Sequence, residues 1–114
     1  MNNTEKVAVL WTSGDVEVAE KVVLMYTKGA KMNGWFEEIV LVVWGPSTKL
    51  LATNVSLQNR VKELIEAGVK VKACSVCAGE YNVTSDLENV GLEVIPMGPP
   101  LTDYLKTDWR ILSF

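Results

Sequence analysis

The sequence predicts an α/β fold, in which a mostly parallel sheet of five strands carries helices on both faces. Short apolar runs rich in β-branched residues alternate along the chain with longer stretches in which apolar residues recur at helical spacing. The clearest run, 39–44, is apolar at every position, as expected for a central strand covered on both faces. This alternation indicates parallel strands joined by right-handed helical crossovers. A chain of 114 residues is long enough for one core, so 1–114 is expected to form a single domain.

The N-terminal third contains a predicted strand followed by a predicted helix. Residues 6–12 form a short apolar run bounded by Ser-Gly-Asp, which is typical of a buried strand. Asp15 is suited to cap the next helix, which runs from 16 to about 33 with its apolar residues at helical spacing. Gly29 and Gly34 mark where this helix weakens and ends.

The middle of the chain contains the second strand and the second main helix. The strand at 39–44 ends at a Gly-Pro-Ser sequence, and a helical turn is predicted at 49–52. Asn54 or Ser56 is suited to cap the helix that follows, in which apolar residues recur at positions i, i+4, i+7 and i+8. Gly68 is its expected C-terminal stop.

The rest of the chain continues the alternation of strands and helices. The predicted elements are, in order, a strand at 69–74, a helical segment within 75–90, a strand at 92–95, a loop at 96–100, a short helix at 101–106 and a strand at 109–112. Gly91 ends the helical segment, and Thr102 is a candidate cap of the short helix.

Composition excludes several classes of function. The chain contains no histidine, which excludes Ser-His-Asp and Cys-His catalysis and histidine metal ligands. A net charge of −3 without clustered Lys and Arg argues against a nucleic-acid surface, and Gly45 before Pro46 is only a weak anion signal. No apolar run is long enough to span a membrane and no secretory signal is evident, so we expect a cytoplasmic protein with reduced cysteines. Any chemistry must rely on sulfur, carboxylates, lysines or backbone amides.

Both cysteines lie where a strand is predicted to end and a helix to begin. Cys74 ends the strand at 69–74, and Cys77 follows three residues later. Ligands of parallel α/β proteins bind at the carboxyl ends of the strands, and the amides of a helix N-terminus favour thiolate over thiol. We therefore expect a reactive thiolate at Cys74 that is accessible to another macromolecule. The alternative is a small buried residue without a chemical role.

The Cys-x-x-Cys spacing is compatible with three kinds of site: a redox dithiol, half of a metal site, or one active thiol beside an incidental one. Zinc needs four ligands, so two cysteines without histidine would need a second subunit to complete a zinc site. A thioredoxin-type pair follows the first strand of its domain, whereas Cys74 follows the third. We favour one active thiol, with no metal and no cofactor.

Four further residues are expected to support this thiol. Lys72 lies on the same face of its strand as Cys74, where it is either solvated near the sheet edge or holds negative charge beside the sulfur. Trp11 and Trp44 lie at the ends of their strands, and Met97 follows the fourth strand, so all should gather at the carboxyl edge of the sheet. The tryptophans suit a core or subunit interface better than a cofactor site.

Three segments of the chain resemble the DsrE/DsrF-like family, and the likeness covers nearly the whole sequence. They are 41–47, 68–78 and the pair Met97-Gly98 followed by Leu101-Thr102. The most distinctive is Gly-Val-x-Val-x-Ala-Cys with a second cysteine three residues later, and the end of the chain, 109–114, also looks like the terminal strand of the family. The resemblance implies a YchN-like fold, a three-layer α/β/α sandwich around a five-stranded parallel sheet.

The resemblance also implies a function. Its better-understood members are sulfur carriers in sulfur oxidation and tRNA thiolation, in which a cysteine after the third strand accepts sulfane sulfur as a persulfide. Cys74 matches that cysteine, which implies a sulfurtransferase-like carrier with sulfur donor and acceptor proteins as partners and a homotrimeric or homohexameric assembly. Cys77 matches no essential cysteine of these carriers. It is either turned away or able to attack the Cys74 persulfide and release sulfide.

Two alternatives to a sulfur carrier stay open at this point. A dithiol redox protein or sensor would need both Cys74 and Cys77 and would form a reversible disulfide between them. A non-catalytic oligomeric binding subunit would have inert thiols with ordinary pKa values.

Overall fold

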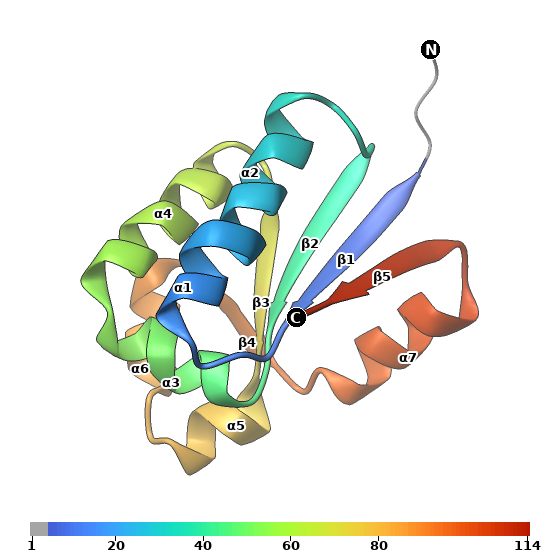
Figure 1. The fold of residues 1–114 in the computed structure, drawn as a ribbon. Coiled ribbons are helices and arrows are strands. Elements are labelled where there is room, and N and C mark those ends of the chain that lie inside the picture. The colour runs from blue at the N-terminus through green and yellow to red at the C-terminus, as the bar shows by residue number, and fades with distance from the viewer. Residues whose placement is uncertain (1–4) are drawn as a thin grey trace.

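The computed structural model describes residues 5–114. All five strands form one parallel sheet in the order β4-β3-β2-β1-β5 (Figure 1). The strands are β1 (Lys6–Trp11), β2 (Glu38–Val43), β3 (Lys70–Cys74), β4 (Glu93–Ile95) and β5 (Trp109–Ser113). The predicted α/β/α fold with a five-stranded parallel sheet is confirmed, and the strand predicted to be central, β2, lies in the middle of the sheet.

The helices cover the two faces of the sheet unequally. They are α1 (Val16–Val18), the π-helical turn η1 (Ala19–Val23), α2 (Leu24–Met32), α3 (Pro46–Thr53), α4 (Val55–Glu66), α5 (Ser75–Glu80), α6 (Thr84–Val90) and α7 (Gly98–Lys106). Strands β2, β3 and β4 follow one another on one side of β1, and β5 pairs with β1 on its other side. Right-handed crossovers that run in opposite directions along a sheet pass over opposite faces. Of the helices in residues 5–114, α7 is therefore the one that lies on the second face (Figure 1).

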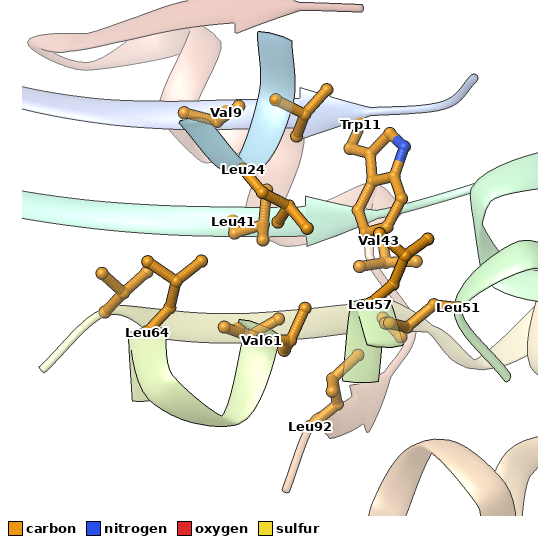
Figure 2. Packing of buried hydrophobic residues seen from close by; sticks show 14 of the residues in the cluster. Val9, Trp11, Leu24, Leu41, Val43, Leu51, Leu57, Val61, Leu64 and Leu92 are labelled. Carbon is orange, nitrogen blue, oxygen red and sulfur yellow. The ribbon is translucent and has the colours of Figure 1, made fainter. Parts of the chain in front are cut away.

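The sheet separates two apolar clusters. The larger one contains the buried apolar residues of the helices from η1 to α6 together with strand residues that include Val9, Leu41 and Val43 (Figure 2). The smaller one joins Val40 and Val42 of β2 to residues around α7. No helix within 5–114 combines the length and apolar character needed to cross a membrane.

Local sequence explains where the helices begin and end. Asp15 accepts a hydrogen bond from the Val18 amide at 3.0 Å, and Asn54 accepts one from the Leu57 amide at 3.0 Å, so both serve as N-caps as predicted. Gly91 ends α6 in the left-handed conformation, with φ of 112°.

Three helices differ from the sequence-based expectation. The predicted turn at 49–52 is a full helix, α3, because Pro46 occupies its first turn, where a proline costs no hydrogen bond. The segment predicted within 75–90 is divided into α5 and α6 by a turn in which Asn82 has a positive φ of 58°. Helix α7 begins at Gly98 instead of Leu101, since the prolines again fall in its first turn, and the Thr102 hydroxyl donates to the Gly98 carbonyl instead of capping.

A π-helical turn interrupts the N-terminal helix and was not expected from the sequence. In η1 the Leu24 amide donates to the Ala19 carbonyl, which widens the helix and disturbs the regular pairing of nearby carbonyls. The Arg60 guanidinium of α4 donates to the Glu20 carbonyl at 3.1 Å. Arg60 therefore stabilises the widened turn and ties α4 to the N-terminal helix.

Replacing Arg60 should destabilise the fold through this contact. We expect Arg60→Met to lower the free energy of unfolding by about 1–2 kcal/mol, because a hydrogen bond from a charged donor is lost and a carbonyl is left without it. Urea titration followed by circular dichroism measures the change. Lys62→Met, at an exposed position of the same helix, is the matched control and should change it by less than about 0.5 kcal/mol. Equal effects of the two variants would contradict this role of Arg60.

Candidate functional site

The carboxyl edge of the sheet brings the ends of three strands together around Cys74. Cys74 is the last residue of β3 and the N-cap of α5, as the sequence predicts. It pairs in register with Ile95, the last residue of β4, while Ala73 pairs with Val43, the last residue of β2. The loops that leave β2 and β4 therefore start beside the thiol.

Cys74 is a free thiol with a pKa below its ordinary value of 9.0. Burial of the sulfur raises the pKa, but the backbone N–H groups of Cys77, Met97 and Val76 stabilise the thiolate, and the Cys77 side chain adds a further hydrogen bond. Together these donors outweigh burial. The main-chain amides come from two places, the first turn of α5 and the loop after β4.

Cys77 has the opposite electrostatic character. Its pKa is raised above 9.0 by burial, by the negative charge and hydrogen bond of Cys74, and by the charge of Glu80, although the Gly45 amide acts in the other direction. Cys77 is a half-buried free thiol that packs against the same cluster as Cys74. The pair therefore consists of a thiolate-forming sulfur and a neighbouring sulfur that keeps its proton.

This arrangement can perform nucleophilic sulfur chemistry. The nucleophile is the thiolate, and main-chain dipoles stabilise it without an added charged side chain. Across residues 5–114, no three or more Cys, Asp or Glu side chains are grouped so that they could hold a metal ion.

Comparison with known proteins identifies the family. The sequence model of the DsrE/DsrF-like family matches residues 5–114. The chain belongs to this family. The family match includes both cysteines and every strand of the sheet.

Solved structures support the same fold. A conserved protein of unknown function from Bacteroides thetaiotaomicron, BT1422, is 34% identical with a TM-score of 0.93, over 96% of this chain and 95% of that one. MTH1491 from Methanobacterium thermoautotrophicum, also of unknown function, is 17% identical with a TM-score of 0.72 (96% and 99% covered). The ychN protein from E. coli is 14% identical with a TM-score of 0.71 (97% and 99% covered), which is a likeness of fold. A search of curated proteins gave no match.

Two of the predicted supporting residues lie in the same cluster as Cys74. Met97 is fully buried in the cluster that contains Cys74, and its backbone amide is one of the donors to the thiolate. Trp44 directly follows β2, is half-buried and packs against the same cluster. Met97 thus acts at least in part through its main chain, which a side-chain pattern does not reveal.

Lys72 shares a strand face with Cys74, but the largest contributions to the lowered pKa of Cys74 come from backbone amides. Lys72 is half-buried and pairs in register with Glu93 of β4 and Val42 of β2. This placement favours the simpler of the two predicted roles, that of a partly solvated lysine near the sheet edge, on the strand next to the edge strand β4.

Trp11 is not brought to the site. Its side chain is completely buried in the larger cluster, on the opposite face of the sheet from Cys74, and Figure 2 shows it beside Val43. The indole N–H donates to the Ser13 carbonyl at 3.0 Å. Strand β1 ends at the carboxyl edge of the sheet, as predicted. Side chains alternate between the two faces along a strand, however, and Trp11 points to the face covered by the helices from η1 to α6.

The expectation that Cys74 is accessible to another macromolecule is wrong for this structure, in which the residue is buried. The residue is 3% exposed, because the loop containing Met97 and the first turn of α5 surround the sulfur. Cys77 and Trp44 are the more exposed groups next to it.

Two loops place backbone amides beside the thiols, and the sequence did not predict these contacts. The Gly45 amide, at a glycine with φ of 73°, lies within hydrogen-bonding reach of the Cys77 sulfur, and the Met97 amide lies near that of Cys74. The signal available in the sequence was a single glycine before Pro46, which indicates an anion site only weakly. In this structure the Gly45 amide acts on the Cys77 thiol and lowers its pKa against the larger effect of burial.

Proposed function

We propose that this chain is a sulfurtransferase-like sulfur carrier that accepts sulfane sulfur as a persulfide on Cys74 and transfers it to a partner thiol. The observation that carries the proposal is the lowered pKa of a cysteine at the carboxyl edge of the sheet, stabilised by amides from two separate loops. Membership of the DsrE/DsrF-like family supports it.

The lowered pKa matters because the attacking species is the thiolate. The Cys74 thiolate attacks the outer sulfur of a donor persulfide, R–S–SH. The donor S–S bond breaks, R–S⁻ leaves and takes up a proton, and Cys74–S–S⁻ forms with the proton of the outer sulfur released. An acceptor thiolate then attacks the outer sulfur and regenerates the Cys74 thiolate.

The burial of Cys74, which is 3% exposed, supports small donors of sulfur. We propose that the donor presents its persulfide on an extended cysteine side chain or on a small thiol. The half-buried Cys77 and Trp44 would form the rim that such a donor contacts. We propose donor and acceptor proteins of this kind as the partners.

We also propose a homotrimeric or homohexameric assembly. Among the helices of residues 5–114, only α7 covers the second face of the sheet. Half-buried apolar residues remain there at the border of the smaller cluster, among them Leu10, Trp44, Ile95 and Ile111. Covering these residues with another copy of the chain would remove apolar surface from water. A trimer or hexamer in light scattering is the expected result.

Sulfur loading tests the proposal directly. The reduced protein is mixed with glutathione persulfide and examined at once by intact mass measurement, alongside Cys74→Ser and Cys77→Ser. Cys77→Ser should gain one sulfur atom. Cys74→Ser should gain none, because serine cannot form a persulfide and burial raises the pKa of the remaining thiol, Cys77, which disfavours its thiolate. If Cys74 fails to accept sulfur in the Cys77→Ser protein, the chain is not a carrier, and inert thiols would favour a non-catalytic binding subunit.

A further inference from the structure

We infer, on the basis of the proposed function, that Cys77 resolves the Cys74 persulfide, so that the wild-type chain reduces sulfane sulfur to sulfide in addition to carrying it. The sequence left open whether Cys77 is turned away from Cys74. The placement of the two thiols answers that question.

The two side chains occupy the N-cap and third positions of α5. Cys74 is the N-cap, with φ and ψ of −70° and 119°, and Cys77 is the third residue of the helix. Both the backbone amide and the side chain of Cys77 lie within hydrogen-bonding reach of the Cys74 sulfur, where they lower its pKa. Both cysteines also pack in the same cluster with Met97. Cys77 is therefore directed at the sulfur of Cys74 and not away from it.

The position of Cys77 determines which sulfur it attacks. A persulfide has an inner sulfur, which is the Cys74 Sγ itself, and an outer sulfur that extends beyond it. Amides from α5 and from the loop at Met97 hold the inner sulfur in place. Cys77, three residues away on the same short helix, faces this inner sulfur, and attack there forms an intramolecular disulfide.

The reaction balances without an external oxidant. Cys77 gives up its proton to the outer sulfur, the Cys77 sulfur bonds to the Cys74 Sγ, the bond between the inner and outer sulfur breaks, and the outer sulfur leaves as HS⁻ with that proton. The sulfane sulfur gains two electrons, and the two cysteines lose two in forming the Cys74–Cys77 disulfide. A dithiol reductant, as a small molecule or a protein, then restores both thiols.

The site has features that suit this second step. Cys77 is half-buried and more exposed than Cys74, so an external dithiol can reach the disulfide from its side. Its raised pKa keeps the proton on Cys77 while the Cys74 thiolate makes the first attack. Loading and resolution can then follow one another without competition between two thiolates.

A single-turnover experiment tests the inference. Reduced protein, freed of reductant and kept anaerobic, is mixed with one equivalent of glutathione persulfide and quenched with iodoacetamide after increasing times. Intact mass reports the extra sulfur or the disulfide, and monobromobimane trapping reports sulfide. Cys77→Ser and Cys77→Ala are the comparison proteins, and Cys74→Ser gives the background release from the donor.

The wild type should lose two hydrogen atoms, resist alkylation and release one sulfide per chain. Both Cys77 variants should keep the extra sulfur on Cys74 and release sulfide at least about tenfold more slowly, since they lack the resolving thiol. A wild type that keeps its persulfide as long as the Cys77 variants would overturn the inference and leave the carrier function standing. Failure of the Cys77 variants to accept sulfur would instead contradict the carrier function itself.

Discussion

Trp11→Ala should lower the free energy of unfolding by about 3–5 kcal/mol, the range found when a fully buried tryptophan is truncated. The Trp11 side chain is 0% exposed and lies between β1 and the helical layer, beside Val43 (Figure 2). The truncation leaves a cavity and removes the hydrogen bond from the indole N–H to the Ser13 carbonyl. Urea titration followed by circular dichroism measures the loss.

Trp35→Ala is the matched control for this substitution. Trp35 is 51% exposed and makes a tilted ring contact with Tyr26 at 5.8 Å, so its truncation should cost only about 1 kcal/mol. A milder variant, Trp11→Phe, should fold and retain the reactivity of Cys74, because Trp11 lies on the opposite face of the sheet. Equal losses from Trp11→Ala and Trp35→Ala would contradict the burial of Trp11, and a slower reaction of Cys74 in Trp11→Phe would place that side chain in the site.

Alkylation of Cys74 should have its midpoint below pH 9.0, and alkylation of Cys77 should have its midpoint above it. Backbone amides stabilise the Cys74 thiolate, whereas Cys77 must ionise beside that negative charge. Timed reaction with iodoacetamide across the pH range, followed by peptide mass mapping, resolves the two thiols. Unfolding the protein in urea should bring both midpoints back toward the ordinary value.

The same pKa shifts predict how stability depends on pH. Because the folded pKa of Cys74 is lowered, its contribution to stability is present above 9.0 and is lost as the pH falls through the folded pKa. Wild type should therefore gain stability relative to Cys74→Ser as the pH rises through that window. The pKa of Cys77 is shifted in the opposite direction. Its contribution to stability is therefore present below 9.0 and is lost as the pH rises through its raised pKa in the folded protein.

The variant Lys72→Ala tests which groups lower the pKa of Cys74. Since backbone amides make the main contributions that lower the pKa of Cys74, this variant should leave its alkylation midpoint nearly unchanged. A clear upward movement would show that the lysine charge holds the thiolate, as one of the two sequence-based hypotheses proposed. A midpoint of Cys74 at or above 9.0 in the wild type would remove the main support for a reactive thiol.

Much of the fold could be predicted because local signals agree with the final structure. The apolar run of β2 indicated a central strand, and Asp15, Asn54 and Gly91 mark helix ends through interactions within a few residues of themselves. The predictions were wrong where a proline suggested a loop. Helix α3 begins at Pro46, and α7 begins at Gly98 with Pro99 in its first turn, because the first turn of a helix does not need the amide that proline lacks.

The sequence by itself determined the order of the elements and the place of Cys74 at the end of the third strand. Both depend on apolar periodicity and capping, which act over short distances along the chain. Only the tertiary structure decided that Trp11 and Cys74 lie on opposite faces, because this depends on how separate strands align. It also decided the ionisation of the two thiols. The amides of Met97 and Gly45 reach the sulfurs from loops distant in the chain, and a short-range pattern carries no information about such contacts.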